Sequence, residues 1–228
     1  SAKAEEASLN ATLKTAWMSI SLVDTGKRYN RDWRFRHLNF QFSTGTAYAI
    51  TGPNGSGKST LLQVIAGALS ASEGKIEYYT KSNQQHSGTP VDADNFYRHI
   101  SFAAPYLELI EEMTLLEFLH FHQQFKPLLA SPAIPDIIRL IGLEKATHKQ
   151  IRYFSSGMKQ RVKLAQSVFS DTPVLLLDEP CTNLDAEGVA LYQQLITAYC
   201  KNRLIIVSSN DEMEYLFCSE QLNINDYK

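Results

Sequence analysis

One eight-residue segment restricts what this chain can fold into more than any other feature. Residues 52–59 read GPNGSGKS and fit G-x-x-x-x-G-K-[ST], a phosphate-binding loop that joins a strand to a helix. Glycines let successive backbone N–H groups turn toward an anion. Residues 46–51 are strand-like and residues 59–66 are helical, so the positive end of a helix dipole faces the loop. The segment predicts a nucleoside triphosphate site in an α/β fold.

The side chains at the end of this loop have separate expected roles. Lys58 is expected to reach the β- and γ-phosphate oxygens, and the Ser59 hydroxyl to bind Mg²⁺. The cofactors expected from this loop are therefore a nucleoside triphosphate and Mg²⁺. The nucleotide is expected to contact the whole loop and the first turn of the helix, namely Gly52, Pro53, Asn54, Gly55, Ser56, Gly57, Lys58, Ser59 and Thr60.

Length, charge and cysteine usage narrow the class of protein. A chain of 228 residues forms one large domain or a core with an inserted subdomain. The net charge of −2 gives no indication of nucleic acid as a partner, and three cysteines without metal-type spacing indicate reduced thiols. Because no apolar run approaches the length of a membrane span, any membrane role is expected to come through a partner.

The first seventeen residues differ from the rest. Residues 1–17 are rich in Ala, Lys, Glu and Ser, while residues 18–23 begin a strand-like alternation. We expect Met18 to be the natural start and residues 1–17 to be an appended or disordered segment. A native amphipathic helix at the N-terminus is the alternative.

The remaining pattern is strand-rich at first and then helical. Strands are expected at residues 20–23, 35–42, 47–51, 75–79 and 96–103, with a surface loop at 80–94. A helical block follows from about residue 111. Thr114 and Glu117 form a capping box there, and Asp136 is expected to cap a helix over 137–141 that Gly142 ends.

A second motif ends in two carboxylates. Residues 174–177 are a continuous aliphatic run, typical of a parallel strand buried on both faces, and Asp178 and Glu179 follow it. Asp178 suits Mg²⁺ coordination, directly or through water. Glu179 suits polarising the water that attacks the γ-phosphate.

Residues 154–161, which read FSSGMKQR, lie between these motifs and complete a family pattern. With them, residues 18–228 resemble the nucleotide-binding subunit of an ATP-binding cassette (ABC) transporter. Ser155 and Gly157 match that family's Leu-Ser-Gly-Gly-Gln signature, whereas Ser156 and Met158 depart from it. The resemblance implies an α/β P-loop NTPase (RecA-like) core with a parallel central sheet. It also implies an N-terminal antiparallel β subdomain and an inserted α-helical subdomain at about residues 106–170.

Two further positions follow from the resemblance. Asp185, at the end of residues 182–185 (TNLD), resembles the D-loop aspartate at the dimer interface. Tyr29 resembles the A-loop aromatic residue that stacks on adenine, a contact worth about 1–3 kcal/mol in nucleic-acid analogues. Trp33 and Phe35 are rival candidates for that stack, and any of the three can instead belong to the core.

Two departures affect catalysis. The family places a glutamine where this chain has Pro105, and shifting the alignment does not provide one. Tyr106, Glu108 or a water molecule is then expected to take the place of that glutamine as a ligand. Asn210 stands where the family has its switch histidine. Asparagine can donate a hydrogen bond to the γ-phosphate but cannot carry a proton near neutral pH. We therefore expect slow hydrolysis that depends mainly on Glu179.

The resemblance also implies partners. ATP is expected to lie between the phosphate loop of one cassette and residues 155–157 of another, in a head-to-tail homodimer or heterodimer. A membrane-spanning transporter subunit on a separate chain is expected to dock near residues 105–112, where Glu108, Glu111 and Glu112 are acidic. The protein is then cytoplasmic, at the inner face of the cell membrane through that partner.

Two other classes of function remain open. A soluble ABC-type ATPase acting on nucleic acid, ribosomes or cluster assembly is disfavoured by the single cassette and by the absence of a long coiled-coil insertion or a basic patch. A P-loop kinase or another NTP-driven transferase is disfavoured by the signature motif and by the Asp178–Glu179 pair.

Overall fold

The computed structural model describes residues 17–81 and 88–228, which form two compact units. Among these residues, the first unit comprises 17–81, 88–100, Thr172–Asp178 and Asn202–Lys228, and the second comprises Ser101–Asp171 and Glu179–Lys201. The segment expected to be appended or disordered lies outside the described residues, except that Trp17 opens the first strand.

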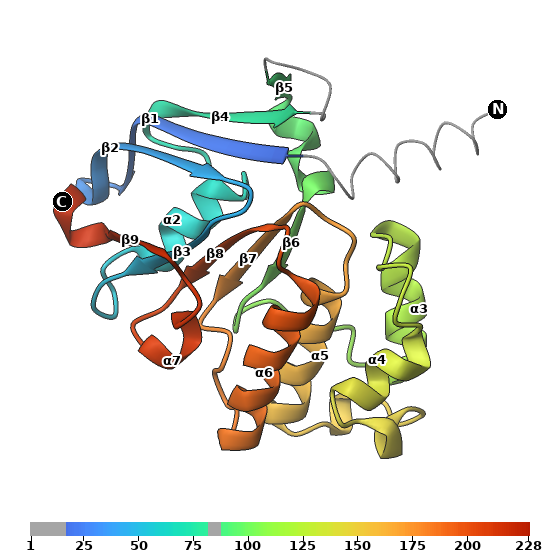
Figure 1. Ribbon diagram of the computed structural model, residues 1–228. Helices are drawn as coiled ribbons and strands as arrows, with labels where there is room; N and C mark the ends of the chain where they lie inside the picture. The colour runs from blue at the N-terminus through green and yellow to red at the C-terminus, as the bar shows by residue number, and fades with distance from the viewer. Residues whose placement is uncertain (1–16, 82–87) are drawn as a thin grey trace. The chain divides into compact units, whose positions relative to one another are not determined.

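An antiparallel sheet forms one layer of the first unit (Figure 1). Its strand order is β2–β1–β4–β5. Side chains that alternate along β1 and β2, such as Ile20, Leu22 and Phe42, are fully or almost fully buried, which gives the sheet one apolar face. The strands are β1 (Trp17–Tyr29), β2 (Asp32–Ser43), β4 (Glu73–Lys81) and β5 (Thr89–Val91).

The second sheet of this unit is parallel. β8 (Leu204–Ser208) pairs with β7 (Val174–Asp178) on one side and with β3 (Ala47–Thr51) on the other, and β9 (Glu220–Asn223) pairs with β3. Every residue of β7 and β8 is buried, as expected for parallel strands covered on both faces. The parallel core and the separate antiparallel sheet confirm the predicted fold class.

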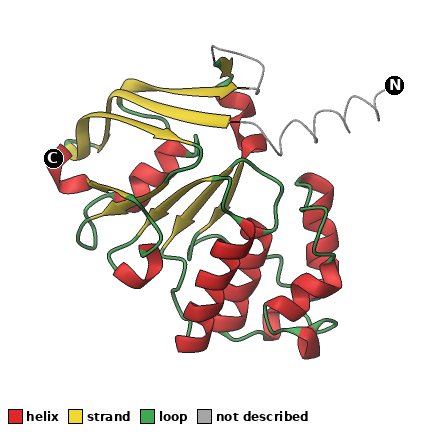
Figure 2. Cartoon of the chain, viewed as in Figure 1, coloured by secondary structure: helices red, strands yellow, loops and turns green. Residues whose placement is uncertain are grey.

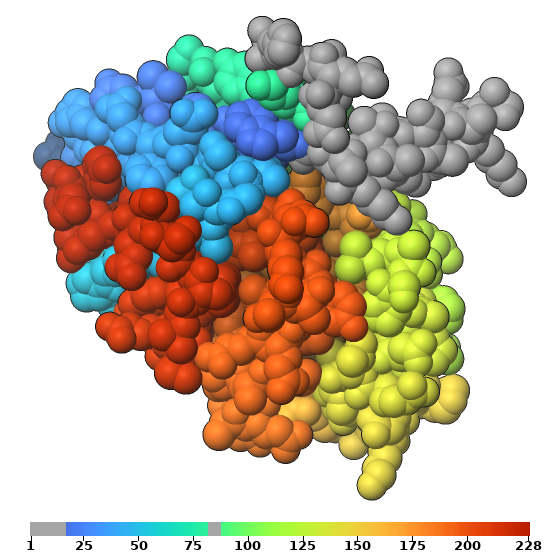
Figure 3. All heavy atoms as spheres, in the orientation of Figure 1, coloured from blue at the N-terminus to red at the C-terminus, as the bar shows by residue number. Residues whose placement is uncertain are grey.

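Short helices complete the first unit. α2 (Lys58–Ile65) follows β3 through the phosphate-binding loop, and α7 (Glu212–Tyr215) follows β8. The 3-10 helix η4 (Ile224–Tyr227) follows β9 and packs against β2, so that the red C-terminal residues adjoin the light-blue strand in Figure 3.

The second unit is helical (Figure 2). Leu115, Phe118 and Leu119 of α3 are buried, as are Val162 and Ala165 of α5, so the apolar faces of the helices supply the core. The main helices are α3 (Leu115–Phe125), α4 (Ile134–Leu140), α5 (Ser156–Val168) and α6 (Ala186–Tyr199), with 3-10 helices η2 (Glu144–Ala146) and η3 (Ile151–Tyr153).

Several local expectations need correction. Residues 93–99 form the 3-10 helix η1 (Ala93–His99), so only β6 (Ile100–Ala103) remains of the strand expected from residue 96. Asp136 does not cap α4, because the helix begins one turn earlier with a proline in its first turn. The capping box of Thr114 and Glu117 is confirmed, since each residue bonds the backbone of the other.

Among residues 17–81 and 88–228, every helix is too short or too polar to cross a lipid bilayer.

Candidate functional site

The phosphate-binding loop lies where the sequence places it, between β3 and α2 of the first unit. Its backbone needs glycine, because Gly52 has φ +144° and Gly57 has φ +103°. A Cβ on Gly52 would also lie 2.9 Å from Ile224 Cγ2 and 2.9 Å from Ser56 Oγ. The loop is therefore closely packed against Ile224 in the C-terminal segment of the chain. Side chains in place of these glycines would disturb the loop.

Lys58 is buried at the first position of α2. Its Nζ donates to the Gly52 carbonyl at 2.8 Å and to the Pro53 carbonyl at 3.2 Å. The loop thus closes around an ammonium group that has three donors. Phosphate oxygens are stronger acceptors than carbonyls, so this arrangement suits an anion that exchanges with the carbonyls.

Three residues near the loop were missed by the sequence analysis. Lys228 Nζ donates to the Ser56 carbonyl at 2.5 Å and to the Arg34 carbonyl at 3.1 Å. Arg34 Cβ would lie 3.2 Å from a Cβ on Gly57, and Ile224 lies against Gly52. The sequence spacing does not link these positions to the loop. The C-terminal residues of η4 come close to the loop because β9, which precedes η4, pairs with β3, which precedes the loop.

Buried oxygens without partners mark the carboxyl ends of β7 and β8. Asp178 is 1% exposed, and within the described part of the chain neither of its carboxylate oxygens has a hydrogen-bond partner. Ser208, opposite Asp178 in the register, has a buried Oγ that likewise lacks one among the described residues. An ionised carboxylate is costly to bury without a partner. Hard oxygen donors of this kind fit Mg²⁺.

The structure brings Asn210 to the phosphate-binding loop. Its Nδ2 donates to Asn54 Oδ1 at 3.2 Å, and both side chains are exposed. The next contact along the chain supports this position, because the Ser209 N–H donates to the Ile50 carbonyl at the end of β3. The amide group of Asn210 thus lies beside the phosphate-binding loop.

The three aromatic candidates have different surroundings. Phe35 is fully buried, so it has no face to offer a base. Trp33 is half-buried, and the Arg36 guanidinium lies 4.5 Å from its ring centroid. Tyr29 is 42% exposed, and its ring contacts the Arg34 guanidinium at 5.8 Å. Arg34 also adjoins Gly57, so the exposed Tyr29 ring contacts a residue that borders the loop.

Glu179 has an unusual backbone conformation. Its φ is +42°, in the left-handed region that residues other than glycine rarely adopt. The Thr182 N–H donates to the Glu179 carbonyl at 3.1 Å, which closes a turn directly after the strand that ends at Asp178. Strained backbone of this kind is concentrated at functional sites. Glu179, whose side chain is half-buried, is the first residue of the second segment of the second unit, whereas Asp178 is the last residue of a segment of the first unit.

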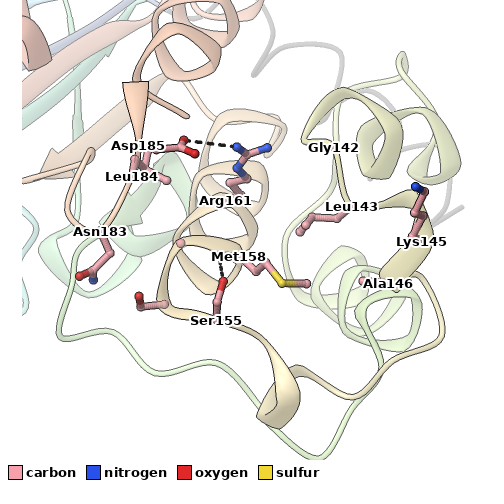
Figure 4. A pocket seen from close by; sticks show the side chains of 12 residues that line it. Gly142, Leu143, Lys145, Ala146, Ser155, Met158, Arg161, Asn183, Leu184 and Asp185 are labelled. Atoms are coloured by element: carbon pink, nitrogen blue, oxygen red, sulfur yellow. Dashed lines mark hydrogen bonds and ion pairs between the residues drawn. The ribbon is translucent and has the colours of Figure 1, made fainter. Parts of the chain in front are cut away.

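The signature residues line a cavity of about 490 Å³ within the second unit (Figure 4). Ser155 is the N-cap of α5, and its Oγ accepts a hydrogen bond from the Met158 N–H at 3.2 Å. Met158 points from α5 into the cavity, so an apolar side chain lies where the family has glutamine. The other wall is formed after the end of α4 by Gly142 and Leu143 and by Lys145 and Ala146 of η2.

Close contacts fix the D-loop to the signature helix. A Cβ on Gly157 would lie 3.0 Å from the Asn183 carbonyl oxygen, so a larger residue there would have to displace that carbonyl. Gln160 Nε2 donates to the Pro180 carbonyl at 2.7 Å, and Arg161 pairs with Asp185 at 3.7 Å. Asp185 also caps α6 by accepting from the Gly188 N–H at 2.8 Å. Ser155, Gly157 and Asp185 are thus held on one wall of the cavity.

Pro105 lines a second cavity of the same unit, about 500 Å³ in volume. The acidic residues predicted to form a docking edge line it too, but two of them already have cationic partners. Lys159 pairs with Glu111, and Arg152 pairs with Glu112 at 3.8 Å. The edge is therefore less negative than the sequence suggests.

Comparison with known proteins places these features in one family. The family model described as "ABC transporter" matches residues 35–182. A cytochrome c biogenesis ATP-binding export protein CcmA from Xylella fastidiosa (strain 9a5c) is 35% identical over 71% of this chain and 70% of its own length. An uncharacterized ABC transporter ATP-binding protein YybJ from Bacillus subtilis (strain 168) is 28% identical over 90% of this chain and 92% of its own length.

Solved structures show the same fold. A putative ABC transporter ATP-binding protein from Pyrococcus furiosus superposes with a TM-score of 0.73 at 20% identity, covering 92% of this chain and 99% of that one. The dimeric post-hydrolysis state of the ATP-binding cassette MJ0796, bound to ADP and phosphate, gives a TM-score of 0.73 at 23% identity, covering 90% and 94%.

Proposed function

Because this chain belongs to the ABC transporter family as an ATP-binding and ATP-hydrolysing subunit, we propose that it hydrolyses MgATP with the residues described above. The names of its relatives include an export protein and a sulfate/thiosulfate import protein, so family membership carries the ATP chemistry and not a cargo.

Residues of the first unit would bind the nucleotide. Backbone N–H groups of residues 52–60, other than Pro53, would surround the phosphates, while Lys58 exchanges its carbonyl acceptors for phosphate oxygens. Tyr29, whose ring is exposed and adjoins Arg34, would stack on the adenine. Asn210 would donate to the γ-phosphate from its position at Asn54.

Carboxylates would carry the hydrolytic step. Ser59 and Asp178 would hold the Mg²⁺ that offsets the negative charge of the phosphates. Glu179 follows Asp178 directly and would orient and polarise the attacking water, accepting its proton as the bond to phosphorus forms. Because Asn210 cannot take up a proton near neutral pH, hydrolysis would be slow and depend on Glu179.

A second cassette would complete the site. Ser155, Gly157 and the free backbone N–H groups at the start of α5 would contact the phosphates of a nucleotide on the other protomer. Asp185, on the same wall, would lie at the dimer interface. ATP would then favour the closed dimer and hydrolysis would release it. The dimer can be formed by two copies of this chain or with a different cassette.

The membrane connection is the last part of the proposal. A membrane-spanning transporter subunit on a separate chain would hold this protein at the inner face of the cell membrane. Capture from detergent-solubilised cells tests it. Near-stoichiometric recovery of a multi-span membrane protein is expected, whereas recovery with soluble proteins alone would favour an ABC-type ATPase that is not attached to a transporter.

The observation that carries the proposal is the buried Asp178 carboxylate, unpartnered among the described residues, in the same unit as the Lys58 loop. The test is phosphate release from MgATP by the wild type, by Glu179→Gln and by Glu187→Gln as an exposed control. We expect Glu179→Gln to abolish turnover while retaining ATP binding, and EDTA to stop release by the wild type. Normal turnover in Glu179→Gln would show that another group acts as the base.

A further inference from the structure

Two lysines of α5 reach the segment that contains Pro105. Lys163 Nζ donates to the Pro105 carbonyl at 2.6 Å, and Lys159, one turn earlier, pairs with the Glu111 carboxylate. Both lysines, Pro105 and Glu111 line the second cavity. The same helix begins directly after Ser155, so the helix that carries the signature residues also contacts this segment.

The Pro105 carbonyl is a distinctive point of attachment. Proline has no N–H, so the carbonyl is the only backbone hydrogen-bonding group that residue 105 has. The Leu107 N–H donates to the Ala104 carbonyl at 3.2 Å and closes a turn around it. A hydrogen bond from an ammonium group is stronger than one between neutral groups. Lys163 is half-buried, and burial together with the neighbouring Lys159 charge lowers its pKa, while Glu108 acts in the opposite direction.

Backbone contacts fix the other end of the segment. The Arg152 N–H donates to the Glu111 carbonyl at 3.0 Å, and the Ile151 N–H donates to the Met113 carbonyl at 2.9 Å. Gln150 Nε2 donates to the Glu112 carbonyl at 2.9 Å. Residues 111–113 are therefore bound to Gln150 and to the 3-10 helix η3, which lies just before the signature residues, and Lys163 supplies the corresponding attachment at residue 105.

We propose that Lys163 is a positioning residue that attaches the Pro105 segment to the signature helix, so that residues 105–112 and Ser155–Gly157 move as one body. This inference rests on the proposed function, because the movement is the ATP-driven closure of two cassettes. It assigns to a lysine of α5 the coupling that the missing glutamine cannot provide. A partner bound in the second cavity would contact Pro105 and Lys163, the two residues that form this attachment.

Hydrogen exchange with and without MgATP tests the attachment in a Glu179→Gln background, which retains the nucleotide. In that protein we expect ATP to slow exchange at residues 52–60, at the signature loop and, roughly tenfold, at residues 106–112. In Glu179→Gln with Lys163→Met, slowing at residues 52–60 and the signature loop should persist while slowing at 106–112 is lost. Lys163→Arg should restore it, because a guanidinium also donates to a carbonyl. Lys149→Met is the matched control on an exposed lysine of the same unit.

The outcomes separate this inference from the proposed function. Slowing at residues 106–112 that survives Lys163→Met, or that is missing when residues 52–60 and the signature loop are protected, overturns the attachment. Missing protection at residues 52–60 overturns the proposed function instead. If Lys163→Met does not fold, judged by thermal unfolding, Lys163→Leu replaces it because leucine likewise has no donor, and undiminished slowing in that variant overturns the attachment equally.

Discussion

The phosphate-binding loop of the first unit and the signature region of the second are built in different ways. In the loop, the backbone conformation determines the structure, because three glycines have positive φ. Every fixed position of the motif also has the residue that the pattern requires. In the signature region, Ser156, Met158 and Pro105 depart from the family pattern, and side chains hold the structure. Gln160, Arg161 and Lys163 each bond a carbonyl or a carboxylate in a neighbouring loop.

This difference has a functional meaning. A site made of backbone N–H groups tolerates few substitutions, because positive φ values and close packing restrict the loop to glycine at several positions. A site held by side chains can change its residues, provided that new contacts replace the lost ones. The departures at residues 105 and 158 are therefore compatible with a working cassette, and the two regions should respond differently to mutation.

The largest expected effect comes from Lys58→Met in the loop. The substitution keeps most of the side-chain length but removes the ammonium group that bonds the Gly52 and Pro53 carbonyls. Loss of a charge-assisted contact to phosphate costs about 3 kcal/mol, so ATP affinity should fall roughly 100-fold. Titration with a fluorescent ATP analogue measures this change.

Lys145→Met is the matched control, because Lys145 is exposed and lines the signature cavity of the second unit. It should leave ATP affinity of the monomer unchanged. Equal loss of affinity in the two variants would contradict the assignment of nucleotide binding to the first unit.

A smaller effect is expected from the aromatic residues. Tyr29→Leu should weaken ATP binding by about 1–2 kcal/mol, roughly tenfold, because the exposed ring would no longer stack on adenine. Trp33→Leu should leave the affinity nearly unchanged, since the Trp33 side chain is half-buried and therefore less exposed than Tyr29. Isothermal titration of both variants decides between them, and the reverse order of effects would identify Trp33 as the stacking residue.

The same contrast explains what could be predicted from the sequence. The phosphate-binding loop and the strands β3 and β7 could be predicted, because glycine positions and aliphatic runs determine the local backbone conformation. The start of β6 was misjudged, since residues 93–99 have apolar residues suited to a strand but form a capped 3-10 helix. Lys228 and Lys163 could not be predicted, because their partners lie 172 and 58 residues away along the chain. Such contacts depend on the packing of whole elements.

The smallest functional effect is expected at His122 in α3 of the second unit. Burial, with a further contribution from the Lys126 charge, lowers the pKa of His122 to about 4. Its Nε2 lies 2.9 Å from Ser170 Oγ, and that hydroxyl donates to the Gln166 carbonyl at 2.5 Å, so the neutral imidazole is the donor in the pair. His122 lines neither of the two cavities, and its substitution should leave ATP binding at neutral pH unchanged.

His122 should instead affect stability in acid. In the unfolded chain the pKa of a histidine is about 6.5, so between pH 6.5 and 4 the unfolded state binds a proton that the folded state does not. The free energy of unfolding should therefore fall as the pH drops through this window, by on the order of 2 kcal/mol from His122.

His122→Gln keeps an amide donor for Ser170 and should show a flatter dependence of the unfolding free energy on pH, measured by urea unfolding at several pH values. His120→Gln, at an exposed position two residues earlier, should follow the wild type. Parallel curves for the wild type and His122→Gln would contradict the neutral, buried state of His122.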